Sequence, residues 1–293
     1  MSHIAARHQA RHLVIGKTVS RLLTTYYRGR DHPLKLRLWR YMRQISGYAP
    51  LTVASGEGRW ITLYERDWPQ SHILNRGAYE PEVWTALAQH VTQDEVVWDV
   101  GAHIGSFALA AAQDSRVRSV CAFEPDPLNL VALRRNLALN GNPALVYPVA
   151  LSDTTERKTL IHGPATNSGM STLAPSASTG MSQHTSVARP PLPTFEVECR
   201  TADDLVMQDA VPAPTLMKVD VEGWEYRVLV GASGLLQSAT LKALVFESAC
   251  GTNGRSEDKR LVSLLHQYNY SLSRIERPDG ELRGVENYLA VHR

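Results

Sequence analysis

Runs of apolar residues, each ending at a turn or an acidic side chain, recur along the chain from about residue 96 onward. Residues 96–100, 120–123 and 215–219 are short, largely apolar runs, and this pattern predicts buried strands. Residues 144–149 and 241–246 have the same character. Helix-forming stretches separate the runs, and this alternation predicts an α/β fold with a mostly parallel central sheet.

Two further patterns extend this prediction. Asp126 suits a helix N-cap, Pro127 the first helical position and Gly141 the position past the end, so a helix is expected between them. Residues 270–275 and 288–292 read as strands on either side of a Pro-Asp-Gly turn. They predict an antiparallel hairpin at one edge of the sheet.

A glycine turn follows the first predicted strand directly. Gly101 and Gly105 come shortly after Asp99, and the second predicted strand ends at Glu124. In open α/β sheets such glycines let the backbone approach a nucleotide, and an acid at the end of the next strand binds ribose hydroxyls. The pairing predicts a site for an adenosyl group at the carboxyl edge of the sheet.

The spacing of the glycines distinguishes two kinds of cofactor. A dinucleotide site carries G-x-G-x-x-G, whereas three other residues separate Gly101 from Gly105. The carboxylate of Asp99 would repel a pyrophosphate and attract an ammonium group. Both features favour a methionine-type sulfonium cofactor over a nicotinamide dinucleotide.

Four sequence blocks occur in an order and spacing that resemble the FkbM family of S-adenosylmethionine-dependent methyltransferases. They are residues 99–106, 123–127, 150–153 and 218–225. The resemblance implies a Rossmann-like class I methyltransferase fold and S-adenosyl-L-methionine as the cofactor. His103 departs from the family pattern, which usually has asparagine there, so it either contacts the cofactor or serves only as a turn residue.

The resemblance also implies roles outside the glycine turn. Ser152 and Asp153 would lie against adenine, and the segment around Tyr79 and Glu80 would either close over the methionine end or form a plain turn. The residues expected to bind the cofactor are Asp99, Gly101, Ala102, His103, Gly105, Ser106, Glu124, Asp126, Ser152, Asp153, Tyr79 and Glu80.

A second group of charged residues surrounds the end of the predicted strand 215–219. Asp220 and Glu222 follow this strand, at the same edge as the glycine turn. A hydroxyl acceptor must lose its proton during methyl transfer, and we expect Asp220 to take it, with Glu222 and Lys218 as the next candidates. The alternatives are structural: Lys218 pairs with a carboxylate, and the acids cap or begin the following helix. Another alternative is that Asp220 and neighbouring acids hold a divalent cation that binds vicinal hydroxyls. No carboxylate pair has the spacing of a metal site, so no metal is expected.

Residues 162–194 are rich in Gly, Ser, Thr and Pro and predict a loop or lid inserted in the catalytic domain. The resemblance places a substrate-side loop in this region. The residues expected to face the acceptor are Asn167, Ser168, Ser171, Thr172 and, from the end of the predicted strand 241–246, Glu247. For Glu247 the alternative is that it only orients its neighbours.

The chain divides into three expected parts. Residues 1–50 form a basic helical extension, residues 51–90 a lead-in segment, and residues 91–293 the methyltransferase domain. In the lead-in segment, residues 60–64 alternate as in an edge strand, and Pro81 marks a helix start.

Positive charge is concentrated in the extension. Residues 1–50 contain ten Lys or Arg and a single acid, Asp31, whereas the whole chain has a net charge of only +2. Such a segment either contacts a membrane surface or a protein partner, or forms a solvated amphipathic helix. No nucleic-acid partner is expected, and a homo-oligomer is left open.

The remaining composition bounds the location of the protein. The sequence contains no apolar run of about 20 residues and no secretory signal pattern. We therefore expect a cytoplasmic protein that is peripheral at the membrane if its extension binds lipid. The three cysteines are widely spaced and fit free thiols.

Together these features predict an S-adenosylmethionine-dependent O-methyltransferase. The resemblance implies that its acceptor is a hydroxyl of a sugar, glycolipid, polyketide or other secondary metabolite. Two alternatives stay open: a nicotinamide-dependent oxidoreductase on a similar sheet, and a non-catalytic cofactor-binding partner protein docked through its basic extension.

Overall fold

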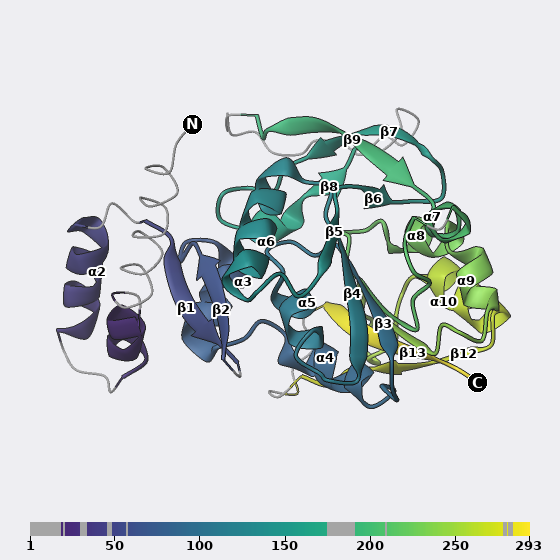
Figure 1. Ribbon diagram of the computed structural model, residues 1–293, viewed down its shortest axis with the longest axis horizontal. Coiled ribbons are helices and arrows are strands. Elements are labelled where there is room, and N and C mark those ends of the chain that lie inside the picture. The colour runs from purple at the N-terminus through teal and green to yellow at the C-terminus, as the bar shows by residue number, and fades with distance from the viewer. Residues whose placement is uncertain are drawn as a thin grey trace.

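A seven-stranded sheet forms the centre of the molecule in this computed structural model (Figure 1). The structure describes residues 19, 21–29, 34–45, 49–56, 58–174, 191–208, 210–277, 280 and 284–293. In spatial order the strands are β12 (Tyr270–Arg274), β13 (Val285–His292), β11 (Ala243–Ala249), β10 (Leu216–Val219), β3 (Glu95–Val100), β4 (Val117–Phe123) and β5 (Leu145–Tyr147). Strand β13 runs antiparallel to both of its neighbours, β11 and β12, and the other neighbouring pairs are parallel. This arrangement confirms the mostly parallel sheet with an antiparallel edge hairpin.

Helices cover both faces of this sheet. Helices α4 (Pro81–Ala88), α5 (Ser106–Ala111) and α6 (Pro127–Leu139) lie on one face, and α7 (Ala202–Met207), α8 (Glu225–Val230), α9 (Ser233–Gln237) and α10 (Lys259–Gln267) on the other. Successive strand side chains alternate between the two layers, so Val97 packs on the first and Trp98 on the second. Both layers bury apolar side chains, which explains why the central strands are apolar runs.

Helix α6 begins as the sequence predicts. The Asp126 side chain accepts hydrogen bonds from the backbone of Leu128 at 2.8 Å and of Asn129 at 3.4 Å, and Pro127 occupies the first helical position. Such a cap contributes about 1 kcal/mol and fixes where the chain leaves the carboxyl edge of β4.

Residues 60–64, expected as an edge strand, lie mostly in β2 (Arg59–Leu63). Among the described strands it pairs only with β1 (Leu51–Ser55), in a two-stranded sheet that is separate from the central one. Its free edge is covered by side chains of α6, because Thr62 N donates to Asn136 Oδ1 and Trp60 N to Asn140 Oδ1, each at 2.8 Å. The sequence alone did not indicate this pairing.

The lead-in segment packs as part of the main body. Residues of β1, β2, α3 (Trp68–Arg76) and α4 share one hydrophobic cluster with the central sheet and with α5 and α6. This hydrophobic core continues across residue 90. The expected boundary between the lead-in segment and the methyltransferase domain at that residue stays a prediction.

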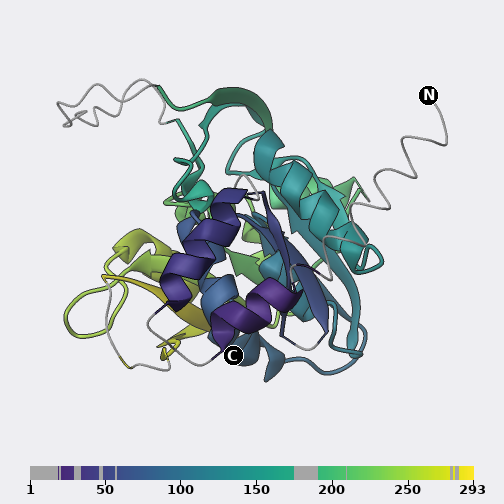
Figure 2. The ribbon, with the colours of Figure 1, turned by 90° about the vertical axis from the view of Figure 1, so that its left-hand side faces the viewer.

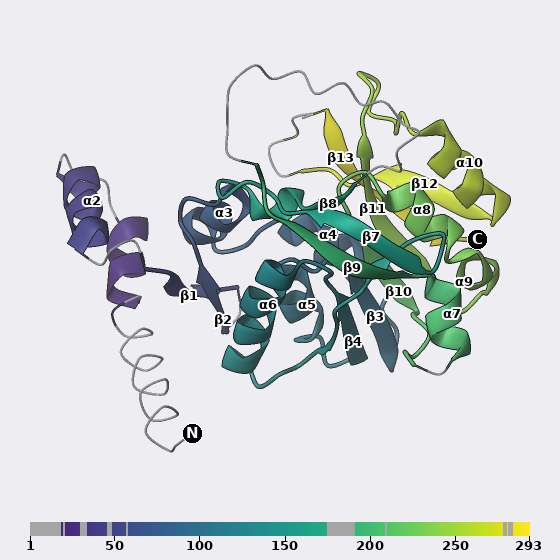
Figure 3. The ribbon, with the colours of Figure 1, turned by 90° about the horizontal axis from the view of Figure 1, so that it is seen from above.

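The described part of the basic extension is helical. Residues 21–28 and α2 (Lys35–Ile45) form two helices at one end of the molecule, outside β1 and β2 (Figures 1 and 3). The side chain of Arg28 anchors the first helix by donating to Ile73 O at 2.7 Å and Leu74 O at 2.8 Å. The rest of the expected helix, before residue 19, lies outside the described residues. No helix within the described ranges is both long and apolar enough to cross a membrane.

A third sheet occupies the region between β5 and α7. Its strands follow the order β6 (Ala150–Leu151), β9 (Thr194–Arg200), β7 (Glu156–Ile161) and β8 (Thr172–Leu173). Residues 162–194, expected as a loop, therefore include the strand β8 and a 3₁₀ turn, η1 (Ser168–Met170). Residues 175–190 of the expected lid lie outside the described residues.

Candidate active site

The turn after β3 is tied to the two neighbouring strands. Gly101 N and Ala102 N both donate to Phe123 O at the end of β4, at 3.0 Å each, and Asp220 N donates to Val100 O at 3.0 Å. Gly101 has a φ of +81°, a conformation that glycine adopts without strain. These contacts bring the glycine turn, Glu124 and Asp220 to one edge of the sheet.

Glu124 lies at the centre of this edge and is only 4% exposed. Its Oε2 accepts a hydrogen bond from His103 N at 2.7 Å, and its Oε1 accepts one from Asp126 N at 2.9 Å. Burial raises the pKa of Glu124 to about 7, against the opposing effect of these two backbone donors. Each carboxylate oxygen keeps a lone pair that can accept a ribose hydroxyl.

A small cavity of about 50 Å³ adjoins Glu124. Its walls come from the ends of β3, β4 and β10, from β6 and from the segment around η1, and they include Pro125, Leu151 and Trp224. A volume of this size is well below the roughly 300 Å³ of a small-molecule site. An adenosyl group, which the sequence predicts beside Glu124, would therefore need a wall of this space to shift outward. The space is called the donor cavity below for this predicted role.

A cleft of about 790 Å³ lies beside the donor cavity. It extends from the glycine turn to α4, α5 and the start of β13, and Tyr79, Phe107 and Arg277 are among its lining residues. The residues that line both spaces are Gly101, His103, Gly169, Asp220 and Glu222. The two spaces thus meet beside the carboxylates of Asp220 and Glu222.

Lys218 lies between two carboxylates at the end of β10. Its Nζ is 2.9 Å from Asp220 Oδ2 and 3.7 Å from Asp99 Oδ1. Burial disfavours the ammonium charge, but Asp220 and Asp99 outweigh this effect and raise the pKa of Lys218 above its usual value. Lys218 therefore stays protonated, a state in which it orients Asp220 and has no lone pair to accept a proton.

Three glutamates line the cleft around Asp220. Burial, together with the charge of Asp220, raises the pKa of Glu222 to about 7 and that of Glu247 to about 9. Burial and the same neighbour also raise the pKa of Glu80, whose Oε1 lies 3.6 Å from Arg277 Nη2. At neutral pH Glu247 therefore carries a proton and can donate a hydrogen bond to a ligand oxygen.

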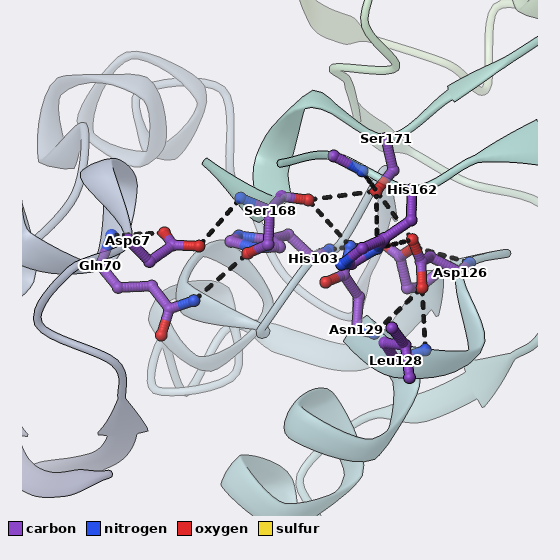
Figure 4. A network of polar contacts seen from close by, with 11 residues as sticks. Asp67, Gln70, His103, Asp126, Leu128, Asn129, His162, Ser168 and Ser171 are labelled. Atoms are coloured by element: carbon purple, nitrogen blue, oxygen red, sulfur yellow. Dashed lines mark hydrogen bonds and ion pairs between the residues drawn. The ribbon is translucent and has the colours of Figure 1, made fainter. Parts of the chain in front are cut away.

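A network of polar contacts connects the lead-in segment with the glycine turn (Figure 4). Asp67 Oδ2 accepts a hydrogen bond from Ser168 N at 2.9 Å, and Ser168 Oγ lies 2.6 Å from His103 Nε2. Gln70 Nε2 also donates to Ser168 Oγ at 3.3 Å. Burial lowers the pKa of His103, which favours a neutral ring in this bond. The 3₁₀ turn η1 is held against the glycine turn by these contacts.

The other end of the network converges on Asp126. Its Oδ2 lies 2.5 Å from His162 Nδ1 and accepts a hydrogen bond from Ser171 Oγ at 2.7 Å. Ser171 Oγ also accepts a hydrogen bond from Gly163 N at 3.0 Å. Asp126 thus caps α6 with one oxygen and holds the segment before β8 with the other.

The structure brings seven of the twelve expected cofactor residues to the two spaces. Those seven are Gly101, Ala102, His103, Ser106, Glu124, Tyr79 and Glu80. The expected residues that line neither space are Asp99, Gly105, Asp126, Ser152 and Asp153.

These five residues make contacts within the protein. Asp99 is fully buried and accepts a hydrogen bond from Ala108 N at 3.0 Å, and Gly105 packs on Leu133 with a φ of +87°. Asp153 pairs with Arg227 at 2.8 Å. In place of Ser152 and Asp153, the preceding Ala150 and Leu151 line the donor cavity.

All three expected catalytic residues, Lys218, Asp220 and Glu222, line the cleft. Among the substrate-loop residues, Asn167 lines the cleft, and its buried Oδ1 has no hydrogen-bond partner in the described part of the chain. Ser171 and Thr172 line the donor cavity, whereas Ser168 acts behind it through His103. Glu247 lies inside β11 and not at its end, because β11 continues to Ala249.

Several residues at this site carry no signal in the sequence. Asp67, His162 and Arg277 are single polar residues in loops, and each reaches the site only through contacts between distant parts of the chain. Trp68 and Trp224 line the cleft and the donor cavity, respectively. Within the described ranges, no three His, Cys, Asp or Glu side chains lie together in a way that could hold a metal ion.

Comparisons with known proteins place relatives beside this chain. A family model described as the methyltransferase FkbM domain matches residues 99–272. The hexuronic acid methyltransferase AglP of Haloferax volcanii is 30% identical over 219 residues, which cover 74% of this chain and 78% of that protein. The 31-O-demethyl-FK506 methyltransferase FkbM of Streptomyces tacrolimicus is 30% identical over 190 residues and is covered over 68% of its length. Among solved structures, the methyltransferase FkbM of Methylobacillus flagellatus is similar with a TM-score of 0.45 at 18% identity, over 90% of this chain and 72% of that one.

Proposed function

Because the chain belongs to the FkbM methyltransferase family and is an S-adenosylmethionine-dependent enzyme, we propose that it methylates a hydroxyl group of a sugar or related metabolite. The two relatives act on a hexuronic acid and on 31-O-demethyl-FK506, according to their names. The family assignment weighs against both earlier alternatives, a nicotinamide-dependent oxidoreductase and a non-catalytic partner protein.

One observation of the site supports the proposal most directly. The donor cavity and the large cleft meet beside Asp220 and Glu222. A donor bound at Glu124 and an acceptor bound in the cleft would thus have their reacting groups next to carboxylates. This placement suits a reaction in which a hydroxyl loses its proton as it is methylated.

The residues around the donor cavity fit an adenosyl group. Glu124 has free lone pairs for ribose hydroxyls, and Leu151 and Trp224 offer apolar surface for a purine ring. Tyr79 and Glu80 line the neighbouring part of the cleft, where the methionine end would lie. When bound, the cofactor supplies an electrophilic methyl group whose carbon–sulfur bond breaks as the acceptor oxygen attacks.

The chain supplies positioning and proton transfer. We assign the proton-accepting role to Asp220, which lines both spaces and is held at 2.9 Å by the ammonium group of Lys218. The protonated Glu247 and the partly ionised Glu222 would bind acceptor hydroxyls from the cleft wall. These groups are only partly buried, so a bound acceptor would have to cover them to keep water away from the reacting atoms.

Product analysis tests the proposal. The purified chain is incubated with methyl-labelled S-adenosylmethionine and an extract of its source cell, and labelled products are identified by mass spectrometry and by treatment with alkali. We expect an alkali-stable methyl ether. Label found only on nitrogen, or as an alkali-labile ester, would contradict O-methylation of a hydroxyl.

We propose that the basic extension contacts a surface outside the catalytic domain, on the basis of its ten Lys or Arg against one acid. A cytoplasmic, peripherally attached protein and a homo-oligomer stay predictions.

A further inference from the structure

The extension presents a row of apolar side chains to solvent. Leu34, Leu38, Tyr41 and Ile45, called the α2 stripe below, have exposed fractions of 60, 44, 62 and 70%. Their spacing of four, three and four residues places them on one face of α2 and the turn before it. A surface helix normally turns such a stripe toward the core, whereas α2 turns its stripe toward solvent.

A different face of α2 holds the helix on the protein. Trp39 and Arg43 are buried there, and the Trp39 ring packs on Tyr27 with ring centroids 4.5 Å apart. Arg43 Nε pairs with Glu65 Oε2 at 2.7 Å. The α2 stripe is therefore not needed to attach the helix, and it is free to bind something else.

The charged residues of α2 itself are all positive. Arg37 and Arg40 are exposed, and α2 contains four basic residues and no acid. Leu22, on the neighbouring helix, is 69% exposed and follows Arg21. In Figure 2 the two helices lie in front of the remaining chain, where they form an outer surface of the molecule.

We propose that the α2 stripe docks on a membrane surface that contains anionic lipid. Apolar residues flanked by arginines are the composition of helices that lie in the plane of a membrane interface. At 11 residues α2 is too short to span a bilayer, so it would lie on the surface. A second copy is a poorer occupant, because a symmetric contact would place Arg37 and Arg40 near their own equivalents.

Vesicle flotation tests this inference without any knowledge of the acceptor. The full chain is mixed with vesicles of phosphatidylcholine alone or with added phosphatidylglycerol. We expect flotation with the anionic vesicles only, decreasing as salt is added. Replacing both Arg37 and Arg40 by Gln is expected to weaken binding roughly 30-fold, which corresponds to about 1 kcal/mol for each arginine.

Substitutions in the stripe test the apolar part of the contact. The double variant Leu38→Ser and Tyr41→Ser is expected to weaken flotation by more than about tenfold. Val131→Ser is the matched control, because Val131 is 58% exposed on α6, away from the extension. Binding of S-adenosylhomocysteine, measured by calorimetry, should be unchanged in each of these variants and shows that they are folded.

Three results would overturn the inference. They are the absence of flotation at low salt, equal flotation with neutral and anionic vesicles, and a dimer in gel filtration that Tyr41→Ser dissociates. The last result would assign the α2 stripe to a second copy of the chain. None of these outcomes bears on methyl transfer, which is measured separately.

Discussion

The backbone of Gly101 lies so close to the carbonyl oxygen of Asp220 that a Cβ atom at position 101 would overlap that oxygen. The turn that follows β3 and the turn that follows β10 therefore touch through backbone atoms. One of these turns is expected to hold the cofactor, and the other carries the proposed proton acceptor. This close approach thus sets the distance between the turn expected to hold the cofactor and the turn that carries the proposed proton acceptor.

Gly101→Ala is expected to disturb this approach strongly. The new methyl group would clash with the carbonyl oxygen of Asp220. The φ of +81° at position 101 would also strain an alanine backbone. We expect a loss of at least about 3 kcal/mol in the free energy of unfolding, measured by urea denaturation. Gly141→Ala is the control, because Gly141 has a φ of +83° but no atom within 4 Å of the added carbon. Its expected loss is only about 1 to 2 kcal/mol, from the backbone strain alone. Equal losses in the two variants would show that the close approach is unimportant.

Glu124→Ala is expected to weaken cofactor binding. The substitution removes the proposed acceptor for the ribose hydroxyls and leaves the N–H groups of His103 and Asp126 without their partner. Calorimetry with S-adenosylhomocysteine should show a loss of at least about 30-fold in affinity, because each hydrogen bond to a charged group contributes about 1.5 to 3 kcal/mol. Glu124→Gln keeps one acceptor oxygen and should lose less. Wild-type affinity in both variants would remove Glu124 from the ribose role.

Asp220→Asn is expected to separate binding from turnover. The amide has the shape of the carboxylate but cannot take a proton from the acceptor, so kcat should fall by about 100-fold or more. The affinity for S-adenosylhomocysteine should change little. Asp114→Asn is the control, because Asp114 lines the far part of the same cleft and pairs with Arg116.

A variant of Asp220 with wild-type kcat would refute its role as base and direct attention to Glu222. If Glu222 is the base, kcat should decline as the pH falls below about 7, its pKa.

Glu247 makes the stability of the protein depend on pH. Its pKa is raised from 4.5 to about 9 in the folded chain, chiefly by burial. Between these values the unfolded chain has released a proton that the folded chain retains, so stability declines as the pH rises. Glu247→Gln removes this contribution, and from pH 6 to pH 8 its unfolding free energy should fall less than that of the wild type, by about 1 to 3 kcal/mol. Glu156→Gln, at an exposed position, should behave as the wild type does in this range. The same decline in all three proteins would show that Glu247 ionises normally.

The central sheet and the position of the glycine turn were predictable from the sequence. Strands β3, β4 and β10 are fully or largely buried, so their apolar runs record their environment directly. The start of α6 was equally clear, since Asp126 and Pro127 act on backbone atoms only a few residues away. Local interactions of this kind leave a local pattern.

The third sheet and much of the site left no such pattern. Strand β7 has mostly polar residues because most of its side chains are partly or fully exposed, and its partner β9 begins 33 residues after β7 ends. The involvement of Asp67 depends on Ser168, 101 residues further along the chain. Contacts at such separations are decided by packing, which composition and periodicity do not record.

The bridge from Asp67 through Ser168 to His103 has a consequence for folding. Strands β3 and β4 with their glycine turn are close in sequence, whereas the bridge closes loops of 101 and 65 residues. Long loops cost more entropy to close, so such contacts tend to form late. We therefore expect a refolding chain to pair β3 with β4 before it regains affinity for the cofactor.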